Sequence, residues 1–325
     1  MAHTVPGRFA GMAIDQASQM FLEALAKPGA PAIHESTPAV ARMSGPILAG
    51  MSGKGPEVGA VEAFRLATRD GDEIRMRVMK PEGVAKSVIV YFHGGGWVIG
   101  DIDLQYDNLA RQLCVKTQSV VVLVNYRKAP EYRFPTAIED SLAGLEWAAE
   151  HKRDLAGSDV PLIVAGDSAG GNIAAVMTLR ARDAGGPHID YQVLVYPVTD
   201  CDFDRPSYVA PENQLLLNRD TMIWFWDHYL PTGDRTHPDA SPLRAKDLSG
   251  LPPALVYLAE CDPLHDEGAE YASALNEAGV EVEVSIAEGQ MHAFFQMANI
   301  LPGFDVGVDY VSERINAHLN KLAEG

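Results

Sequence analysis

The feature that most constrains the fold of this chain is the sequence Gly-Asp-Ser-Ala-Gly at residues 166–170. It follows an apolar run at 161–165, typical of a buried strand, and precedes a helix-like run at 172–182. Glycines on both sides of a serine indicate a sharp strand-to-helix turn, because a Cβ at either position would clash with nearby backbone. Such a turn exposes the serine hydroxyl, so Ser168 is the candidate nucleophile. A glycine-rich turn that only needs small residues is the alternative.

A second group of glycines, His-Gly-Gly-Gly-Trp at 93–97, directly follows another apolar run at 88–92. Consecutive glycines after a strand leave backbone N–H groups free to point at an anion. Acyl transfer passes through a tetrahedral oxyanion, and each preorganised N–H donor is worth about 3 kcal/mol. A phosphate cradle is the other use of such a loop, but the chain lacks the G-x-x-x-x-G-K-[ST] motif. The N–H groups of the predicted oxyanion hole come from Ala169 and from two of Gly94, Gly95 and Gly96.

A serine nucleophile needs a general base, and the base needs a carboxylate that orients it. A strand-like run at 254–259 is followed by Asp262, and a second run at 280–286 leads to His292. Both residues would lie outside the carboxyl ends of parallel strands, where α/β sheets place their ligands. The order serine, acid, histidine is the one used with this type of turn. Ser168, Asp262 and His292 are therefore the predicted catalytic triad.

Other residues compete for these roles. Glu260 and Asp266 lie close to Asp262, but Asp266 falls where the next helix should begin, as one of its N-terminal acids. Asp200 also follows a strand-like run and stays the alternative acid. His93 adjoins the glycine loop, where we expect it to hold the loop by hydrogen bonds instead of acting as a base.

Four motifs in this order resemble those of the hormone-sensitive-lipase-like (bacterial family IV) carboxylesterases of the α/β-hydrolase fold. They are the two glycine motifs above and the segments at 262–268 and 291–294, and the resemblance runs from about Phe64 to the C-terminus. One departure is His265, where the family usually has arginine, and it affects an ion pair of the family but not the triad. The resemblance implies a mostly parallel central sheet flanked by helices, a helical cap, and no metal or other cofactor.

The order of strand-like and helix-like segments favours the same α/β fold. Residues 61–68 and 73–80 predict a hairpin with an Asp-Gly turn, after which strands and helices alternate. That alternation implies a mostly parallel sheet with right-handed crossovers and an antiparallel edge. The later strands are predicted at 88–92, 119–125, 162–165, 193–196, 254–259 and 280–286.

Two segments stand outside this alternation, and the resemblance implies that they fold together over the site. The first is an N-terminal cap segment and linker at 1–56, in which helical spacing at 9–26 precedes a Pro/Gly-rich stretch. The second is a cap insertion at about 203–240, within a catalytic domain at 57–325. Core packing explains their apolar side chains equally well. The candidates for substrate contact are Met20, Phe21, Trp97, Leu216 and Trp224.

Composition narrows the possible partners. The formal net charge of −18 over 325 residues disfavours nucleic acid and anionic membranes. No stretch reaches the roughly 18 apolar residues of a membrane span, and Met1–Met20 lacks the pattern of a signal peptide. Three cysteines without metal-ligand spacing fit a reducing compartment, so we expect a cytoplasmic protein. The strand at 280–286 would leave an exposed edge through which two copies could form a homodimer.

The sequence therefore predicts a serine carboxylesterase that hydrolyses short- to medium-chain acyl esters, its small-molecule substrates, through an acyl-enzyme. An amidase or a lactonase with the same triad would carry the same motifs, so both stay open. A small-molecule receptor that has lost catalysis is the alternative from another class. Such a receptor is expected to have a broken triad, whereas all three members are present in this chain.

Overall fold

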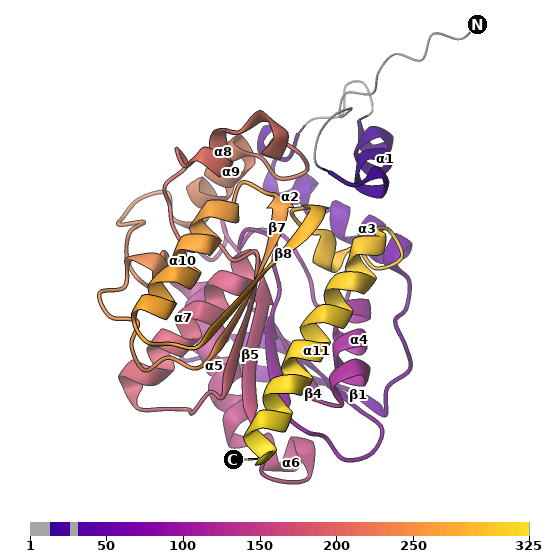
Figure 1. The fold of residues 1–325 in the computed structure, drawn as a ribbon, viewed down its shortest axis with the longest axis vertical. Helices are drawn as coiled ribbons and strands as arrows, with labels where there is room; N and C mark the ends of the chain where they lie inside the picture. The colour runs from indigo at the N-terminus through magenta and orange to yellow at the C-terminus, as the bar shows by residue number, and fades with distance from the viewer. Residues whose placement is uncertain (1–13, 27–31, 325) are drawn as a thin grey trace, which may run out of the picture.

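The computed structural model describes residues 14–26 and 32–324, which form one eight-stranded sheet between two layers of helices (Figure 1). The strands are β1 (Ala60–Ala67), β2 (Glu73–Lys80), β3 (Val88–Phe92), β4 (Val120–Asn125), β5 (Leu162–Asp167), β6 (Tyr191–Val195), β7 (Ala254–Cys261) and β8 (Val282–Met291). The longer helices are α1 (Gln16–Leu25), α3 (Ser44–Ser52), α4 (Asp107–Thr117), α5 (Thr136–Glu150), α7 (Ala169–Ala184), α9 (Arg219–Tyr229), α10 (His265–Glu277) and α11 (Pro302–Glu324). Shorter helical segments are η1 (Ile33–Glu35), α2 (Pro38–Ala41), α6 (Lys152–Ala156), α8 (Pro206–Val209), η2 (Pro211–Asn213), η3 (Pro242–Arg244) and η4 (Phe294–Gln296).

The strand order across the sheet is β1-β2-β4-β3-β5-β6-β7-β8. β1 pairs with β2 and β2 with β4 in antiparallel fashion, while all other neighbours are parallel. The hairpin between β1 and β2 closes through the N–H of Thr68, which donates to the carbonyl of Asp72 at 2.8 Å. The predicted fold class, a mostly parallel sheet with an antiparallel edge, is thereby confirmed.

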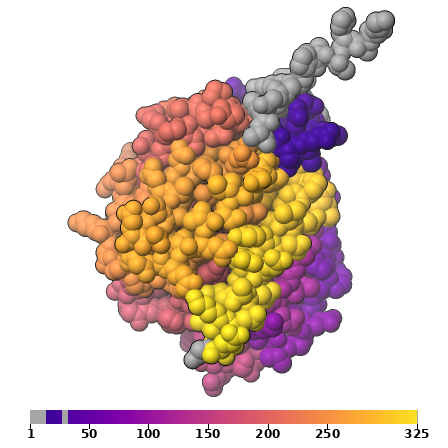
Figure 2. Space-filling model, in the orientation of Figure 1, coloured from indigo at the N-terminus to yellow at the C-terminus, as the bar shows by residue number. Residues whose placement is uncertain are grey.

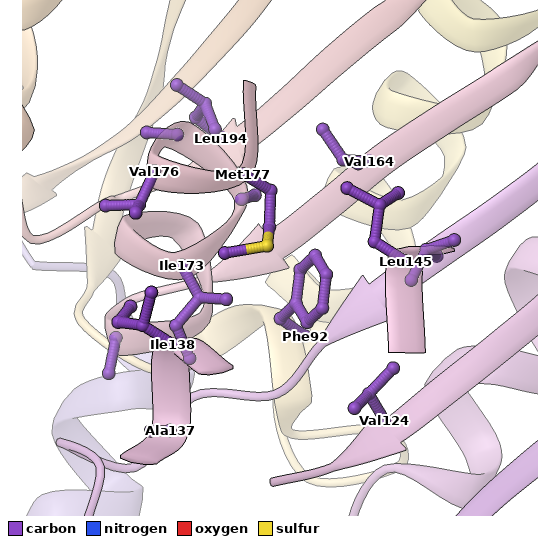
Figure 3. Packing of buried hydrophobic residues seen from close by; sticks show 14 of the residues in the cluster. Phe92, Val124, Ala137, Ile138, Leu145, Val164, Ile173, Val176, Met177 and Leu194 are labelled. Atoms are coloured by element: carbon purple, nitrogen blue, oxygen red, sulfur yellow. The ribbon is translucent and has the colours of Figure 1, made fainter. Parts of the chain in front are cut away.

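The central strands are continuous apolar runs because helices cover both faces of the sheet. Every residue of β3 and β4 is buried, whereas the edge strand β1 alternates between half-buried and exposed residues. α4 and α11 pack on one face, and α5, α7 and α10 pack on the other. Figure 3 shows part of the second layer, where Met177 of α7 lies against Phe92 at the end of β3.

The two segments predicted to form a cap gather at one end of the sheet. α1, α2 and α3 lie there together with α8 and α9 (Figure 1), and the space-filling view shows α1 in indigo and the insertion in salmon at the same end (Figure 2). The ring of His34 in η1 is hydrogen-bonded to Oγ1 of Thr221 in α9 at 3.1 Å. Segments nearly two hundred residues apart are thus joined directly.

The stretch that we expected to be a Pro/Gly-rich linker contains η1, α2 and α3. Thr37 caps α2, and Pro38 takes its first position, where the missing N–H of proline is harmless. Proline therefore begins a helix in this stretch instead of preventing one. Residues 9–13 of the predicted N-terminal helical segment and 27–31 of the predicted linker lie outside the described residues. None of the described helices is both long and apolar enough to cross a bilayer.

Candidate active site

Ser168 lies in the turn between β5 and α7, at the centre of the sheet, with a backbone φ of 57° and ψ of −121°. A positive φ is rare for a residue other than glycine and marks a strained turn. A Cβ at Gly170 would lie 1.9 Å from the carbonyl oxygen of Phe92, and a Cβ at Gly166 would lie 2.3 Å from that of Gly170. Close packing within the turn and against the end of β3 therefore explains both glycines of the motif.

Three side chains from three strand ends form a chain of hydrogen bonds. Nε2 of His292 lies 2.9 Å from Oγ of Ser168, and Nδ1 lies 2.7 Å from Oδ2 of Asp262. Asp262 directly follows β7, and His292 directly follows β8. The carboxylate of Asp262 is fully buried, and its other oxygen accepts the N–H of Leu264 at 2.9 Å. In this geometry Nε2 can accept a proton from the serine hydroxyl while the carboxylate orients the ring.

The competing acids have partners of their own. The carboxylate of Asp200 accepts hydrogen bonds from two arginine guanidinium groups. Glu260 and Asp266 each accept a backbone N–H, at 2.6 and 2.8 Å. Both ring nitrogens of His292 are already bonded to Ser168 and Asp262. The structure therefore brings Asp262, and none of the three alternatives, to the histidine.

The glycine loop after β3 divides its N–H groups between two uses. The N–H of Gly94 donates to Oη of Tyr106 at 2.8 Å and to Oδ1 of Asp167 at 3.1 Å. Gly95 and Gly96 line the cavity that contains Ser168. Among residues 14–26 and 32–324, no acceptor is hydrogen-bonded to the N–H of either glycine. These two donors are thus available to a ligand, whereas Gly94 fixes the loop.

Asp167, the second residue of the serine motif, ties the glycine loop to the nucleophile turn. Its buried carboxylate accepts hydrogen bonds from Oη of Tyr91 at 2.9 Å, from Oη of Tyr106 at 3.0 Å and from Gly94. Burial raises the pKa of Asp167 to about 6, although these three hydrogen bonds and the nearby His292 act in the opposite direction. Burial also raises the pKa of both tyrosines well above the ordinary value, so their hydroxyls stay protonated and can donate.

His93 braces the same loop. Its Nδ1–H donates to the carbonyl of Gly94 at 2.7 Å, and its ring stacks on Tyr126 with the centroids 4.3 Å apart. Oη of Tyr126 donates in turn to the carbonyl of His93 at 2.7 Å. Burial lowers the pKa of His93 to about 3, so the ring is neutral. These contacts agree with a supporting role for His93.

A cavity of about 230 Å³ opens above Ser168 and His292, and its walls are mainly apolar. The N-terminal helices and the insertion both contribute to it, through Phe21, Ile47, Leu48, Met51, Leu216, Leu217 and Phe225. Of the sequence candidates, Phe21 and Leu216 are thus in the wall. Met20 is 61% exposed, Trp97 is buried with its ring stacked 4.2 Å from Tyr229, and the ring of Trp224 packs edge-on against Phe225 with the centroids 5.2 Å apart. These three lie outside the cavity lining.

Sequence reasoning did not identify Asp167 or the wall residues of α3. Asp167 stands inside the serine motif, and its position beside the nucleophile was a usable signal. Ile47, Leu48 and Met51 have helical spacing, but the glycine and proline just before them favoured a linker. Tyr91, Tyr106 and Phe225 carried no local signal, because their roles depend on contacts between distant segments.

Comparison with known proteins places the chain in a family. A family model described as "alpha/beta hydrolase fold" matches residues 89–296. Carboxylesterase NlhH of Mycobacterium tuberculosis is 43% identical over 236 residues, which cover 71% of this chain and 74% of that protein. Ethyl acetate hydrolase of Pseudomonas putida is 36% identical over 277 residues, with 83% and 86% covered.

Solved structures agree with the sequence comparison. The alpha/beta hydrolase LAE6 from the metagenome of Lake Arreo, Spain, has a TM-score of 0.89 at 34% identity, covering 95% of this chain and 99% of its own. A thermostable esterase from Pseudomonas putida has a TM-score of 0.85 at 36% identity, with 94% and 98% covered. The chain therefore belongs to the hormone-sensitive-lipase-like (bacterial family IV) carboxylesterases of the α/β-hydrolase fold.

Proposed function

We propose that this carboxylesterase hydrolyses short- to medium-chain acyl esters through an acyl-enzyme formed on Ser168. The observation that carries the proposal is the hydrogen-bonded chain from Ser168 through His292 to Asp262, with separations of 2.9 and 2.7 Å. Its position at the base of an apolar cavity adds support, because an ester would reach the serine there with its chains away from water.

In the first half of the reaction, Oγ of Ser168 attacks the ester carbonyl while Nε2 of His292 accepts the hydroxyl proton. Asp262 stabilises the imidazolium and keeps Nδ1 protonated. The N–H groups of Gly95, Gly96 and Ala169 bind the oxyanion. Gly94 is left out of this set because its N–H is already bonded to Tyr106 and Asp167.

In the second half, the alcohol leaves with the proton from Nε2 of His292, and the acyl group stays on Ser168. A water molecule then takes the place of the serine hydroxyl: Nε2 accepts its proton as its oxygen attacks the acyl carbonyl. Collapse of the second tetrahedral intermediate returns the proton to Ser168 and releases the acid. The same N–H groups stabilise both intermediates, so one fixed loop serves both steps.

The size of the cavity supports the assignment to short and medium chains. Each buried CH₂ group contributes about 0.8 kcal/mol, so activity should rise with chain length until the space of about 230 Å³ is filled. The Pseudomonas putida relative is named an ethyl acetate hydrolase, which supports activity on short esters.

The test is hydrolysis of p-nitrophenyl esters of increasing acyl length, with a matched p-nitroanilide to detect amidase activity. We expect ester turnover to peak at short or medium chains. Ser168→Ala and His292→Ala should each lose about 10⁶ in kcat, and Asp262→Asn somewhat less. Ser273→Ala, an exposed serine on α10, is the matched control and should keep full activity. Full activity in Ser168→Ala would end the proposal.

The proposal also covers assembly and location. β8 is the last strand of the sheet, with Val284 and Ile286 exposed by 49% and 46%, so we propose that two copies pair along it as a homodimer.

A cytoplasmic location is supported by the cysteines, because Cys114, Cys201 and Cys261 are all free thiols.

A further inference from the structure

Beside the active-site cavity lies a second cavity of about 590 Å³, whose lining includes several charged side chains. Two ion pairs, Arg42 with Glu131 and Arg75 with Asp101, stand in these walls. The ammonium of Lys128 is there as well, bonded to neutral oxygens at 2.8 and 3.1 Å. The proposed reaction uses none of these groups. The second cavity bears on the reaction through the residues that separate it from the active-site cavity.

Among the described residues, Gln105 alone lines both cavities. The chain on either side of it belongs to the same wall. In α3, Ser44 faces the active-site cavity and Gly45 faces the second one. After the glycine loop, Ile99 faces the first and Gly100 the second. The two cavities are therefore adjacent, and the wall between them is one residue thick at Gln105.

Packing, and not hydrogen bonding, holds the side chain of Gln105. It is 5% exposed, and its Oε1 is buried without a hydrogen-bond partner in the part of the chain that the structure describes. A Cβ at Gly45 would lie 3.2 Å from Oε1, so the amide rests directly against α3. The next residue, Tyr106, is bonded to Gly94 and Asp167, which fixes the backbone at this point relative to the nucleophile turn.

We propose that Gln105 is a specificity-determining residue that ends the active-site cavity and sets the length of the substrate chain lying along α3. This inference rests on the proposed function, and it names the side chain that limits the substrate. A chain that reaches Gln105 has reached the end of the active-site cavity, because this side chain also lines the second cavity, where charged groups are present. A longer chain would have to displace the buried amide of Gln105, which stands between the two cavities.

Three variants distinguish the space that the Gln105 side chain fills from the effect of its amide group. Gln105→Ala removes the side chain beyond Cβ and joins the two cavities. Gln105→Met keeps an unbranched side chain of similar length but removes the amide, so the wall stays. We expect Gly45→Ala to act in the opposite direction: Gly45 lines the second cavity and the new Cβ would lie 3.2 Å from Oε1, so the amide should shift toward the first cavity.

The experiment measures kcat/KM of the wild type and the three variants on two series of esters. One series is p-nitrophenyl esters lengthened in the acyl group, and the other is acetate esters lengthened in the alcohol. In one of the two series, Gln105→Ala should improve kcat/KM about tenfold or more for the first chain beyond the wild-type limit. In that series a chain ending in hydroxyl should gain more than one ending in methyl, because the second cavity offers polar partners. Gln105→Met should keep the wild-type limit, and Gly45→Ala should shorten it.

An unchanged length limit for Gln105→Ala in both series, with hydrolysis of p-nitrophenyl acetate retained, would overturn the inference. A limit that lengthens in Gln105→Met would do the same. If Gln105→Ala fails to fold by circular dichroism, Gly45→Ala decides alone, and an unshortened limit counts against the wall. A wild type without any esterase activity would instead contradict the proposed function, so the two failures are distinguishable.

Discussion

Asp167 combines deep burial with a role as hydrogen-bond acceptor that favours its charged form. Its carboxylate is completely buried, yet it must accept hydrogen bonds from Tyr91, Tyr106 and Gly94. An ionised carboxylate accepts all three, whereas a protonated one loses acceptor capacity. The buried charge destabilises the fold at neutral pH, and in return it fixes the loop that carries the proposed oxyanion donors.

This conflict gives a pH prediction. Burial raises the pKa of Asp167 from 3.8 to about 6, so the folded state binds this proton more tightly than the unfolded chain does. The resulting stabilisation is complete below about pH 4 and is lost as the pH rises through about 6. Relative to Asp167→Asn, the free energy of unfolding of the wild type should rise by up to about 3 kcal/mol as the pH falls from 7 to 4. Urea unfolding at several pH values measures this, and parallel curves for the two proteins would contradict it.

Among the elements, the contact between α9 and the glycine loop links the insertion to the chemistry. A Cβ at Gly96 would lie 2.2 Å from the ring of Phe225, so the ring lies directly on the loop. Gly96 also has a φ of 57°, in the region that favours glycine. The insertion therefore does more than cover the cavity, because it fixes the position of one proposed oxyanion donor.

Gly96→Ala should lower kcat by about 10²-fold or more, because the new Cβ forces the loop away from Phe225. Gly157→Ala is the matched control: its φ is 79°, but a Cβ there meets nothing within 4 Å. The control should lose about 1–2 kcal/mol of stability from backbone strain and keep its kcat. Combining Gly96→Ala with Phe225→Ala should recover part of the lost kcat. Equal kcat values for Gly96→Ala and Gly157→Ala would show that the contact between Gly96 and Phe225 does not affect catalysis.

The sequence predicted well those helices and strands whose own residue types favour their secondary structure. β3 and β4 are runs of β-branched and aromatic residues, and their observed bounds lie within one residue of the expected ones. α3 was missed because Gly45 and Pro46 open a helix that is maintained by packing along the cavity. β8 was expected to end at 286 but continues to Met291, since that residue still pairs with Cys261 of β7 after an irregularity in the register. Such cross-strand pairing cannot be recognised from the residues of β8 alone.

The residues of the site also divide into those that a local motif identifies and those that depend on contacts between distant segments. Ser168, Asp262 and His292 could be named from motifs, because each stands at a strand end in a fixed order along the chain. Gln105 and Phe225 could not, because each acts through contact with a glycine far away in the sequence.

For the whole molecule, the open question is assembly along β8. Beside the edge, Glu281 is paired with Lys321 and Glu283 with Arg314, while Glu288 of the same strand is exposed. Val284 and Ile286 are the exposed large apolar residues of β8. Pairing of two edges would complete the open row of backbone hydrogen bonds.

Light scattering at micromolar concentration should therefore report a dimer for the wild type. Ile286→Lys should give a monomer, because it places a charge in the proposed interface. Ester hydrolysis should persist in that monomer, since the triad lies within one chain. A wild type that is monomeric throughout this range would contradict pairing along β8.

Central to the proposed mechanism is that Ser168 and no other residue carries the acyl group. The most direct measurement is reaction with a p-nitrophenyl alkylphosphonate, which forms a stable serine ester with loss of p-nitrophenol, followed by peptide mass spectrometry. We expect one adduct per chain, on the peptide that contains Ser168, with none in Ser168→Ala and much slower labelling in His292→Ala. An adduct on a different residue, or ester hydrolysis that continues unchanged after complete labelling of Ser168, would contradict it.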